Sequence, residues 1–203
     1  DTDEDPHTPM DGFWRGHTGW LIGSHNPVAC IVFAASGFGQ QVMIFWADIR
    51  RVSGRNPPTW RAVCKDLMQE PYLRFLDVPF VMTVVFGLQV WALWAIAEWQ
   101  GVLWLWTAHL FLTNASWAVN SICHWPAFGH RYYDTGEESR DVPWVAWFTN
   151  GEGFHNCHHR FPRSACHALH GGSDLSWTLI RLLVRIGWAR DPWLPRSMKQ
   201  ELL

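Results

Sequence analysis

Two long apolar runs occupy the middle of the chain, separated by a very short polar turn. The first extends from Phe75 to Ala97, the second from Gly101 to Ile122, and only Glu98-Trp99-Gln100 lies between them. At ~1.5 Å per residue each run is long enough to cross a hydrocarbon layer ~30 Å thick. The pattern therefore predicts a transmembrane hairpin of two antiparallel helices over residues 75–122.

A third apolar stretch, Val28 to Ala47, is interrupted by glycines and glutamines. A membrane span, a re-entrant pair and an interfacial helix all fit this pattern. The residues before it, 1–26, are polar and rich in turn formers. The amino-terminal third of the chain is thus expected to contain one polar segment and one apolar segment that lies at or in a membrane.

Two shorter helices are predicted after the hairpin. The segment Val142–Thr149 is apolar, with Pro143 suited to the first helical turn. The segment Leu175–Trp188 predicts an amphipathic helix with Ser173 or Asp174 as its N-cap. Its apolar face fits either a protein core or a membrane surface, and it comprises Leu175, Leu179, Leu182, Leu183 and Ile186.

Tryptophan usage and charge support a membrane location and give it an orientation. The chain contains 16 tryptophans, and four of them flank the short turn like an aromatic belt, namely Trp94, Trp99, Trp104 and Trp106. Six basic residues lie from Arg50 to Arg74, whereas the turn has none. The positive-inside rule then places residues 50–74 and the region after His124 in the cytoplasm. A buried hairpin in a soluble protein is the alternative.

Composition narrows the class of protein further. The formal net charge of −2 argues against a nucleic-acid partner, because such proteins carry a basic excess. The number of cysteines is odd, and two of them lie in or beside histidine-containing motifs, so we expect all of them to be reduced, in a cytosolic environment. They are Cys30, Cys64, Cys123, Cys157 and Cys166.

The strongest chemical signal is a motif rich in histidine. It reads Gly151-Glu152-Gly153-Phe154-His155-Asn156-Cys157-His158-His159-Arg160-Phe161-Pro162. Its histidines stand at i, i+3 and i+4, so a helix would place the three imidazoles on one face, within reach of a shared metal centre. Neutral imidazole is the commonest protein ligand for iron, zinc and copper. We expect His155, His158 and His159 to be metal ligands; a solvated loop is the alternative.

A second polar group lies at the end of the second apolar run. Asn120 and His124 stand at i and i+4, and the helix face that they share extends back through Trp117 and Ser116. Polar side chains in a membrane helix are costly, so they should face protein, a cavity or a metal. We expect His124 to be a fourth metal ligand and Asn120 an auxiliary ligand, bound directly or through water.

The residues among the histidines bear on the kind of metal. Four imidazoles can fill one tetrahedral zinc site. A hydrolytic zinc site, however, usually has a carboxylate base beside its ligands, as in H-E-x-x-H, whereas Asn156 and Cys157 stand between His155 and His158. This favours redox chemistry at iron over zinc hydrolysis. Carboxylates should orient the ligand rings, and Glu152 is the candidate.

Asn120-x-x-x-His124 and the motif at 151–162 together resemble the carboxyl-terminal part of the stearoyl-CoA type of membrane acyl-CoA desaturases. The first seven residues and Gly16-His17-x-Gly19-Trp20-Leu21 resemble the segment that follows the H-x-x-H-H box of that family. Arg131-Tyr132-Tyr133-Asp134 resembles its Arg-Pro-Tyr-Asp turn, with Tyr132 in place of proline.

The resemblance implies a function. In that family a two-iron site, held mainly by histidines, activates O₂ and inserts a cis double bond into a saturated acyl chain. Electrons come from cytochrome b5 or from a ferredoxin-type protein with its reductase. Because the substrate offers no polar handle, a bent tunnel must set the position of reaction. By resemblance, Ser116 and Trp117 line that tunnel, and the catalytic residues are the metal ligands themselves.

The chain also departs from the family pattern. Two earlier histidine boxes, H-x₃₋₄-H and H-x-x-H-H, are missing before the motifs described above. We therefore expect a fragment that carries about half of the ligands and holds one complete iron site or none, whereas the full-length protein holds two irons. Ser24-His25 stands where the family often has a basic pair that contacts the CoA phosphates, so an acyl-carrier protein and a lipid are alternatives to CoA as the acyl carrier. If all boxes meet at one membrane face, Val28–Ala47 is interfacial or crosses twice.

The sequence thus predicts an all-α integral membrane protein with its metal site on the cytoplasmic side. Its parts are a cytosolic segment (1–26), an interfacial segment with a basic cytosolic helix (27–74), the hairpin (75–122) and a cytosolic cap with the histidine motif (123–203). We expect an acyl-CoA desaturase. A related membrane di-iron hydroxylase or oxygenase and a non-catalytic membrane remnant are the alternatives.

Overall fold

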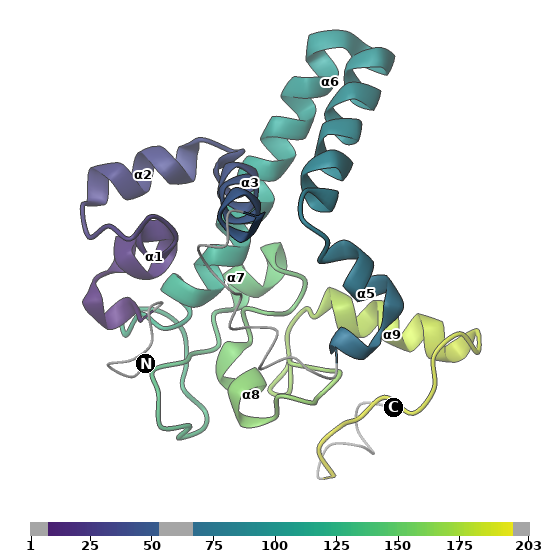
Figure 1. The fold of residues 1–203 in the computed structure, drawn as a ribbon. Helices are drawn as coiled ribbons and strands as arrows, with labels where there is room; N and C mark the ends of the chain where they lie inside the picture. The colour runs from purple at the N-terminus through teal and green to yellow at the C-terminus, as the bar shows by residue number, and fades with distance from the viewer. Residues whose placement is uncertain (1–7, 53–66, 197–203) are drawn as a thin grey trace. The chain divides into compact units, whose positions relative to one another are not determined.

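The computed structural model describes residues 8–52 and 67–196 of the chain. Within these residues the regular elements are all helical, and the only β pairing consists of two isolated bridges, which confirms the all-α expectation. The chain divides into two compact units (Figure 1): unit 1 joins Asp1–Val32 to Asn114–Leu203, and unit 2 is Phe33–Thr113. Several residues used above lie outside the described residues, namely the first seven residues, Arg55, Arg61, Cys64 and Lys65.

Helix α6, Val81–Ile122, contains the predicted hairpin. It has 42 residues, so a straight helix of this length would measure ~63 Å, about twice the hydrocarbon thickness of a bilayer. The backbone leaves the helical region at Ala97 and Glu98, and Figure 1 shows the chain folding back there into two arms. Near this break Gly101 lies so close to the backbone of Leu93 that a Cβ would overlap it. The reversal therefore falls where the sequence predicted the turn.

The first arm begins six residues later than the hydropathy predicts. Phe75 belongs to a separate helix, α5 (Pro71–Leu76), which follows the short helix η3 (Leu67–Gln69). Pro79 has no backbone N–H for a helix, and Phe80 has a φ of 68°. The N–H of Phe80 instead donates to Oδ2 of Asp48 at 2.8 Å. The hydropathy pattern does not reveal this break in the helix, because the residues around it are mostly apolar and the apolar run continues across it.

Many apolar side chains of α6 are exposed, among them Trp91, Ile96 and Leu103. The helix is long and apolar enough to cross a membrane, and none of its most hydropathic 18-residue window is buried within the structure. The tryptophans around the reversal follow the same pattern, since Trp99 and Trp104 are each 75% exposed. A helix from the core of a soluble domain would instead be mostly buried, whereas an exposed apolar surface of this kind marks contact with lipid or protein.

The third apolar stretch forms two helices rather than one. Helix α2 covers Pro27–Ala35 and α3 covers Gly39–Val52, and the two are bent by 98° at the break between them. Gly37 occupies that break with a φ of 70°, and Trp106 donates from its indole to the carbonyl of Ser36 at 2.9 Å. A broken span and a re-entrant pair both fit this geometry, and a single straight crossing does not.

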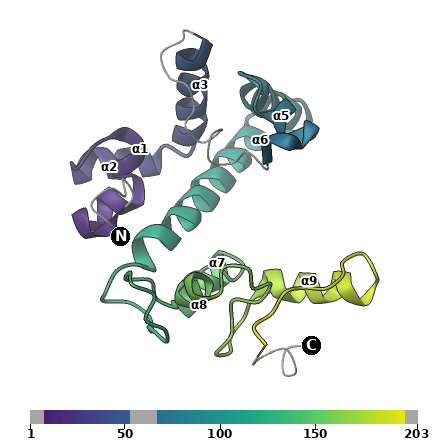
Figure 2. The same cartoon turned by 60° about the horizontal axis from the view of Figure 1, so that its bottom comes forward.

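Unit 1 contains the two predicted short helices. Helix α7 is Pro143–Phe148, with the proline in its first turn, and α9 is Leu175–Arg185, capped by Asp174, whose carboxylate accepts from the N–H of Trp177. Unit 1 also contains most of α2, the end of α6 and four further elements, with α7, α8 and α9 labelled in Figure 2. The four are Pro9–Asp11 (η1), Arg15–Gly19 (η2), Trp20–Ile22 (α1) and His155–Arg160 (α8).

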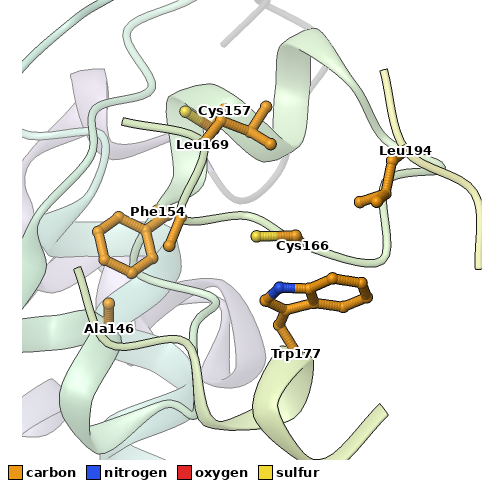
Figure 3. Close-up of a cluster of buried hydrophobic side chains, with 8 residues drawn as sticks. Ala146, Phe154, Cys157, Cys166, Leu169, Trp177 and Leu194 are labelled. Carbon is orange, nitrogen blue, oxygen red and sulfur yellow. The ribbon is translucent and has the colours of Figure 1, made fainter. Parts of the chain in front are cut away.

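Two apolar clusters hold the histidine-bearing part of unit 1 together. The larger is shown in Figure 3 and packs Trp177 of α9 and Ala146 of α7 around Phe154, next to α8. The smaller joins the end of α6 to the start of α7 through Val119, Cys123, Val142 and Val145. The predicted apolar face of α9 is not part of this core, because most of it is exposed, with Leu175, Leu179, Leu182 and Ile186 each 47–55% accessible.

Candidate metal centre

Two glycines of the histidine motif allow α8 to pack beside α7. Gly151 has a φ of 113°, a conformation that side chains with a Cβ rarely adopt. Gly153 lies so close to α7 that a Cβ would overlap the backbone nitrogen of Ala146. The Gly-Glu-Gly segment thus makes a compact turn, after which His155 begins α8. In this way the sequence fixes where the ligand-bearing helix starts.

Three imidazoles from two segments meet at one point. His124 lies in the turn that follows α6, and His155 and His159 lie one helical turn apart on α8. One ring nitrogen from each of the three lies within 4.8 Å of the others, the geometry of a group that can hold a metal ion. Nε2 of His155 and Nε2 of His159 are 3.0 Å apart. The contact between distant segments that the sequence predicted is therefore present.

His158, the remaining predicted imidazole ligand, is not part of this trio. Its ring lies 4.8 Å from that of His167, measured between centroids, and 5.6 Å from the rings of both His155 and His159. Within the described structure its Nδ1 is buried and has no hydrogen-bond partner. A buried ring nitrogen without a partner fits an atom that binds something from outside this part of the chain. The role of His158 as a metal ligand stays a prediction.

The loop before α7, residues 130–141, is tied to α8 by hydrogen bonds of Asn156 and Cys157. Oδ1 of Asn156 accepts from the N–H groups of Tyr132 and Tyr133 at 2.8 and 2.7 Å. Its Nδ2 donates to the Tyr133 carbonyl at 2.9 Å and to the hydroxyls of Thr135 and Ser139 at 3.3 Å. At the end of the loop, Asp141 accepts from the N–H of Cys157 at 3.0 Å. We call this loop the site loop, and these bonds hold it against α8.

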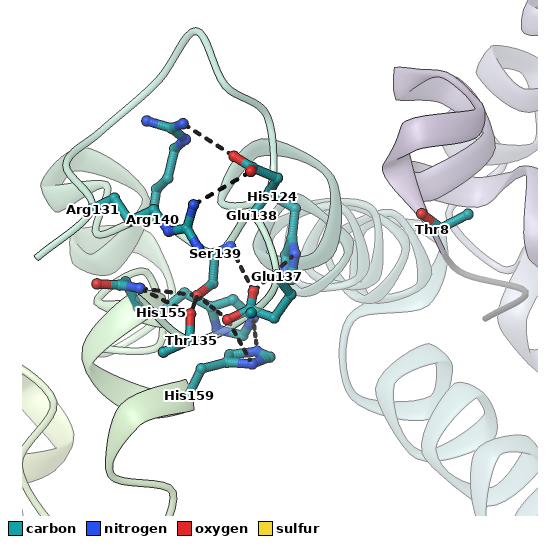
Figure 4. Close-up of polar contacts among 12 residues, drawn as sticks. Thr8, His124, Arg131, Thr135, Glu137, Glu138, Ser139, Arg140, His155 and His159 are labelled. Carbon is teal, nitrogen blue, oxygen red and sulfur yellow. Dashed lines mark hydrogen bonds and ion pairs between the residues drawn. The ribbon is translucent and has the colours of Figure 1, made fainter. Parts of the chain in front are cut away.

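The site loop brings a carboxylate to the histidine trio (Figure 4). Oε2 of Glu137 lies 3.7 Å from Nδ1 of His124, and Oε1 lies 3.5 Å from Nδ1 of His159. Sequence reasoning missed Glu137 and selected Glu152, whose side chain is exposed and makes no ion pair with a histidine in the described part of the chain. No signal near the histidine motif indicates Glu137, because a tertiary contact places it there.

Burial shifts the pKa values of three histidines of the motif and of the nearby thiols. Burial, followed by the charges of neighbouring histidines, lowers the pKa of His155, and burial likewise lowers the pKa of His158 and His159. Burial and then the Asp141 carboxylate raise the pKa of Cys123, and the Cys157 thiol donates to Asp141 at 2.9 Å. A lowered pKa favours the neutral imidazole, the form that binds iron, zinc and copper.

The end of α6 is anchored to the amino-terminal segment. Nδ2 of Asn120 donates to the Gly16 carbonyl at 2.8 Å. Nδ1 of His17 lies 2.8 Å from the Ser121 hydroxyl, and its Nε2 lies 3.2 Å from Oδ1 of Asn114. His17 is thus a packing residue that is hydrogen-bonded through both ring nitrogens. The ligand role of Asn120 stays a prediction, as do the tunnel roles of Ser116, which is exposed, and Trp117, which packs on His17.

The described cysteines agree with the expected redox state. Cys30, Cys123, Cys157 and Cys166 are all free thiols, and all four are buried. Burial, followed by the Asp174 charge, raises the pKa of Cys166 to about 11. Such thiols are poor nucleophiles and poor metal ligands at neutral pH, because the thiolate is the reactive form.

Known proteins resemble the chain over most of its length. It is 35% identical to the sn-1 stearoyl-lipid 9-desaturase of Anabaena variabilis over 94% of this chain and 59% of that protein. It is 32% identical to an acyl-CoA 5-desaturase of Anemone leveillei, and 30% identical to a chloroplastic palmitoyl-monogalactosyldiacylglycerol delta-7 desaturase of Arabidopsis thaliana. These two matches cover 98% and 99% of this chain, but 53% and 46% of the relatives.

The chain spans about half the length of the curated relatives that it matches. No solved structure matches it. The family profile described as fatty acid desaturase matches residues 1–183, which include all three histidines of the trio. The chain therefore belongs to the fatty acid desaturase family.

Proposed function

We propose that this chain forms the carboxyl-terminal, iron-binding part of an O₂-dependent fatty acyl desaturase. The observation that carries the proposal is the meeting of His124, His155 and His159 within 4.8 Å, in a chain of this family. These three imidazoles would hold one iron, with Asn120 as an auxiliary ligand. His158 would then be available to a second iron, whose other ligands come from outside the described residues.

Iron bound here would supply the oxidising power to break two C–H bonds of an unactivated acyl chain. The balanced reaction consumes O₂, two electrons, two protons and two substrate hydrogens, and it releases two waters and the alkene. The residues of this chain contribute by holding and orienting the metal. Because burial lowers the pKa of the ring nitrogens, few protons compete for them at neutral pH.

The exposed apolar surface of α6 supports a membrane-bound enzyme. We infer that the two arms of α6 cross the bilayer and that the histidine trio lies on the cytoplasmic side, where an electron donor such as cytochrome b5 or a ferredoxin-type protein can reach it. The acyl chain would enter a tunnel lined by Ser116 and Trp117, which precede Asn120 on α6. Relatives are named for acyl-CoA and for acyl lipids, and we propose an acyl chain on one of these carriers.

The test is to replace one ligand in the complete product of the gene that encodes this chain. We expect His159→Ala to lower the yield of unsaturated acyl chains at least about 100-fold, because it removes a ligand that the trio cannot replace. The matched control is His130→Ala, since His130 is exposed and lies outside the trio. Each variant is expressed in a host that does not make this unsaturated product, and gas chromatography of total fatty acids measures the yield.

The chemical nature of the product distinguishes desaturation from hydroxylation. An alkene supports a desaturase, whereas an alcohol on the same carbon would assign a hydroxylase built on the same histidines. Feeding labelled acyl-CoA or labelled lipid to membranes distinguishes the two carriers. Full activity of His159→Ala with unchanged iron content would refute the ligand assignment.

A further inference from the structure

The carboxylate of Glu137 lies beside two of the three histidines of the trio. Its two carboxylate oxygens are divided between them, with Oε2 toward Nδ1 of His124 at 3.7 Å and Oε1 toward Nδ1 of His159 at 3.5 Å (Figure 4). Both distances exceed the ~3.2 Å upper range of N–H···O hydrogen bonds, so the contact in this structure is electrostatic. A carboxylate in this place attracts a proton to Nδ1 of each ring.

The carboxylate is held in this orientation by its own loop. The backbone N–H of Ser139 donates to Oε2 at 2.6 Å, and the Ser139 hydroxyl donates to Oε1 at 2.7 Å. Ser139 is fully buried, and its hydroxyl also accepts from Nδ2 of Asn156 on α8. The side chain of Glu137 is only 15% exposed. The chain thus fixes the carboxylate through bonds to the same helix that bears two of the ligands.

The neighbouring acid shows that this arrangement is particular to Glu137. Glu138 points its carboxylate at two arginines, with Oε1 3.4 Å from Arg131 and Oε2 3.2 Å from Arg140, and its side chain is 33% exposed. Glu138 therefore forms ion pairs with two arginines of the site loop.

The ring nitrogens that remain are the ones a metal would use. With Nδ1 of His159 facing Glu137, its Nε2 faces Nε2 of His155. Histidines that bind metals commonly donate the other ring N–H to a carboxylate, which fixes the tautomer and raises the basicity of the ligand atom. We propose that Glu137 is a positioning residue that holds His124 and His159 with the proton on Nδ1 and the free electron pair on Nε2, directed at one metal ion.

This inference rests on metal binding by the trio, which is part of the proposed function, so the test measures binding directly. The 203-residue chain in detergent micelles is titrated with Co²⁺ in the presence of a competing chelator, and the d–d absorption bands report the ligand geometry. The variants are Glu137→Gln, which keeps the shape and removes the charge, and Glu137→Asp, which keeps the charge. Glu138→Gln is the matched control from the same loop.

We expect Glu137→Gln to weaken Co²⁺ binding about 10–100-fold and to shift the absorption bands, because two ligand rings lose their orienting group. Glu137→Asp should recover part of the affinity, and Glu138→Gln should bind within about twofold of the unaltered chain because surface ion pairs contribute little. Nitrogen-15 spectra of the metal-free histidines give a second readout that does not depend on the metal. They should show the Nδ1–H form for His124 and His159 in the unaltered chain.

The outcomes separate the two ideas. If the unaltered chain binds no Co²⁺, metal binding by the trio is refuted and Glu137 loses its role with it. If the unaltered chain binds Co²⁺ and Glu137→Gln binds equally tightly with the same spectrum, only the positioning role is refuted. An equal loss in Glu138→Gln would also overturn it, because the effect would then belong to the loop as a whole. Thermal melting of each variant verifies that the fold is intact.

Discussion

At the scale of single residues, one buried amide makes most of the hydrogen bonds that hold the site loop against α8. Asn156 is fully buried, and both its side-chain oxygen and its side-chain nitrogen are hydrogen-bonded to the loop rather than to α8. Buried polar groups that lose a partner cost about 1–3 kcal/mol each. The loop therefore depends on Asn156 for its position, and so does the carboxylate of Glu137 that the loop carries.

The first prediction concerns this amide. We expect Asn156→Ala to lower the free energy of unfolding by roughly 2–4 kcal/mol, because the N–H groups of Tyr132 and Tyr133 are left without their acceptor. Thermal melting followed by near-ultraviolet circular dichroism measures the effect. Thr135→Val removes a single bond to the same amide, so its loss should be smaller. Equal melting temperatures for the two variants would contradict this account.

Residue spacing predicted part of the candidate site and could not predict the rest. The i, i+4 spacing of His155 and His159, together with the position of His124 after an apolar helix, predicted the meeting of three imidazoles that the structure contains; their role as metal ligands stays a prediction. The same spacing argument placed His158 with them, but its ring lies beside His167, which no motif indicated. No sequence pattern indicated Glu137, because hydrogen bonds between segments far apart in the chain place it beside the trio. Such bonds produce no regular spacing of residues.

At the scale of elements, α9 shows how far a pattern of apolar residues reaches. Its period predicted the helix correctly, and Asp174 proved to be the cap. The period did not tell whether the apolar face is covered, because a core-facing stripe and an exposed stripe have the same spacing. In the structure Trp177 enters the core while Leu179 and Leu182 remain exposed. Whether an apolar helix face is buried depends on the elements that pack against it.

The cap of α9 gives the second prediction in this section. One oxygen of Asp174 accepts from the N–H of Trp177 and the other from the N–H of His167, each at 2.8 Å, and the residue is 5% exposed. Asp174→Ala should therefore lower the free energy of unfolding by about 2–3 kcal/mol, which corresponds to a fall in melting temperature of roughly 4–12 °C.

Ser173→Ala is the control for this change, since Ser173 was the other predicted cap and its side chain is exposed. It should alter the free energy of unfolding by no more than about 0.5 kcal/mol. Differential scanning fluorimetry in detergent compares the two variants. If Ser173→Ala proves as costly as Asp174→Ala, the assignment of the cap is wrong.

At the scale of the whole molecule, the proposed function requires the reversal in α6 and the carboxyl-terminal region to lie on opposite sides of a membrane. Trp99→Cys, beside the reversal, and Arg190→Cys, after α9, place accessible thiols at two exposed positions. The described native cysteines are buried and should react slowly. Replacing Cys64 by serine removes the cysteine that lies outside the described residues.

We expect an impermeant maleimide to label Trp99→Cys only from outside intact cells and Arg190→Cys only in inverted vesicles. The physical reason is that the 42 residues of α6 measure ~63 Å in total, about twice the hydrocarbon thickness, so a chain that crosses twice has its reversal on the far side. A gel shift after labelling measures each reaction. Reaction of both positions from one side would contradict the transmembrane hairpin.

Unit 1 is built from both ends of the chain, and this has a consequence for biosynthesis. The bond from Asn120 to Gly16 and the contact of His17 with Ser121 each join residues 104 positions apart. During synthesis Gly16 and His17 leave the ribosome first. Their bonds to Asn120 and Ser121 cannot form until the whole apolar hairpin has left the ribosome. On the proposed function, α6 leaves the ribosome before His124, His155 and His159 are all present, so the hairpin would enter the membrane before these histidines can bind a metal.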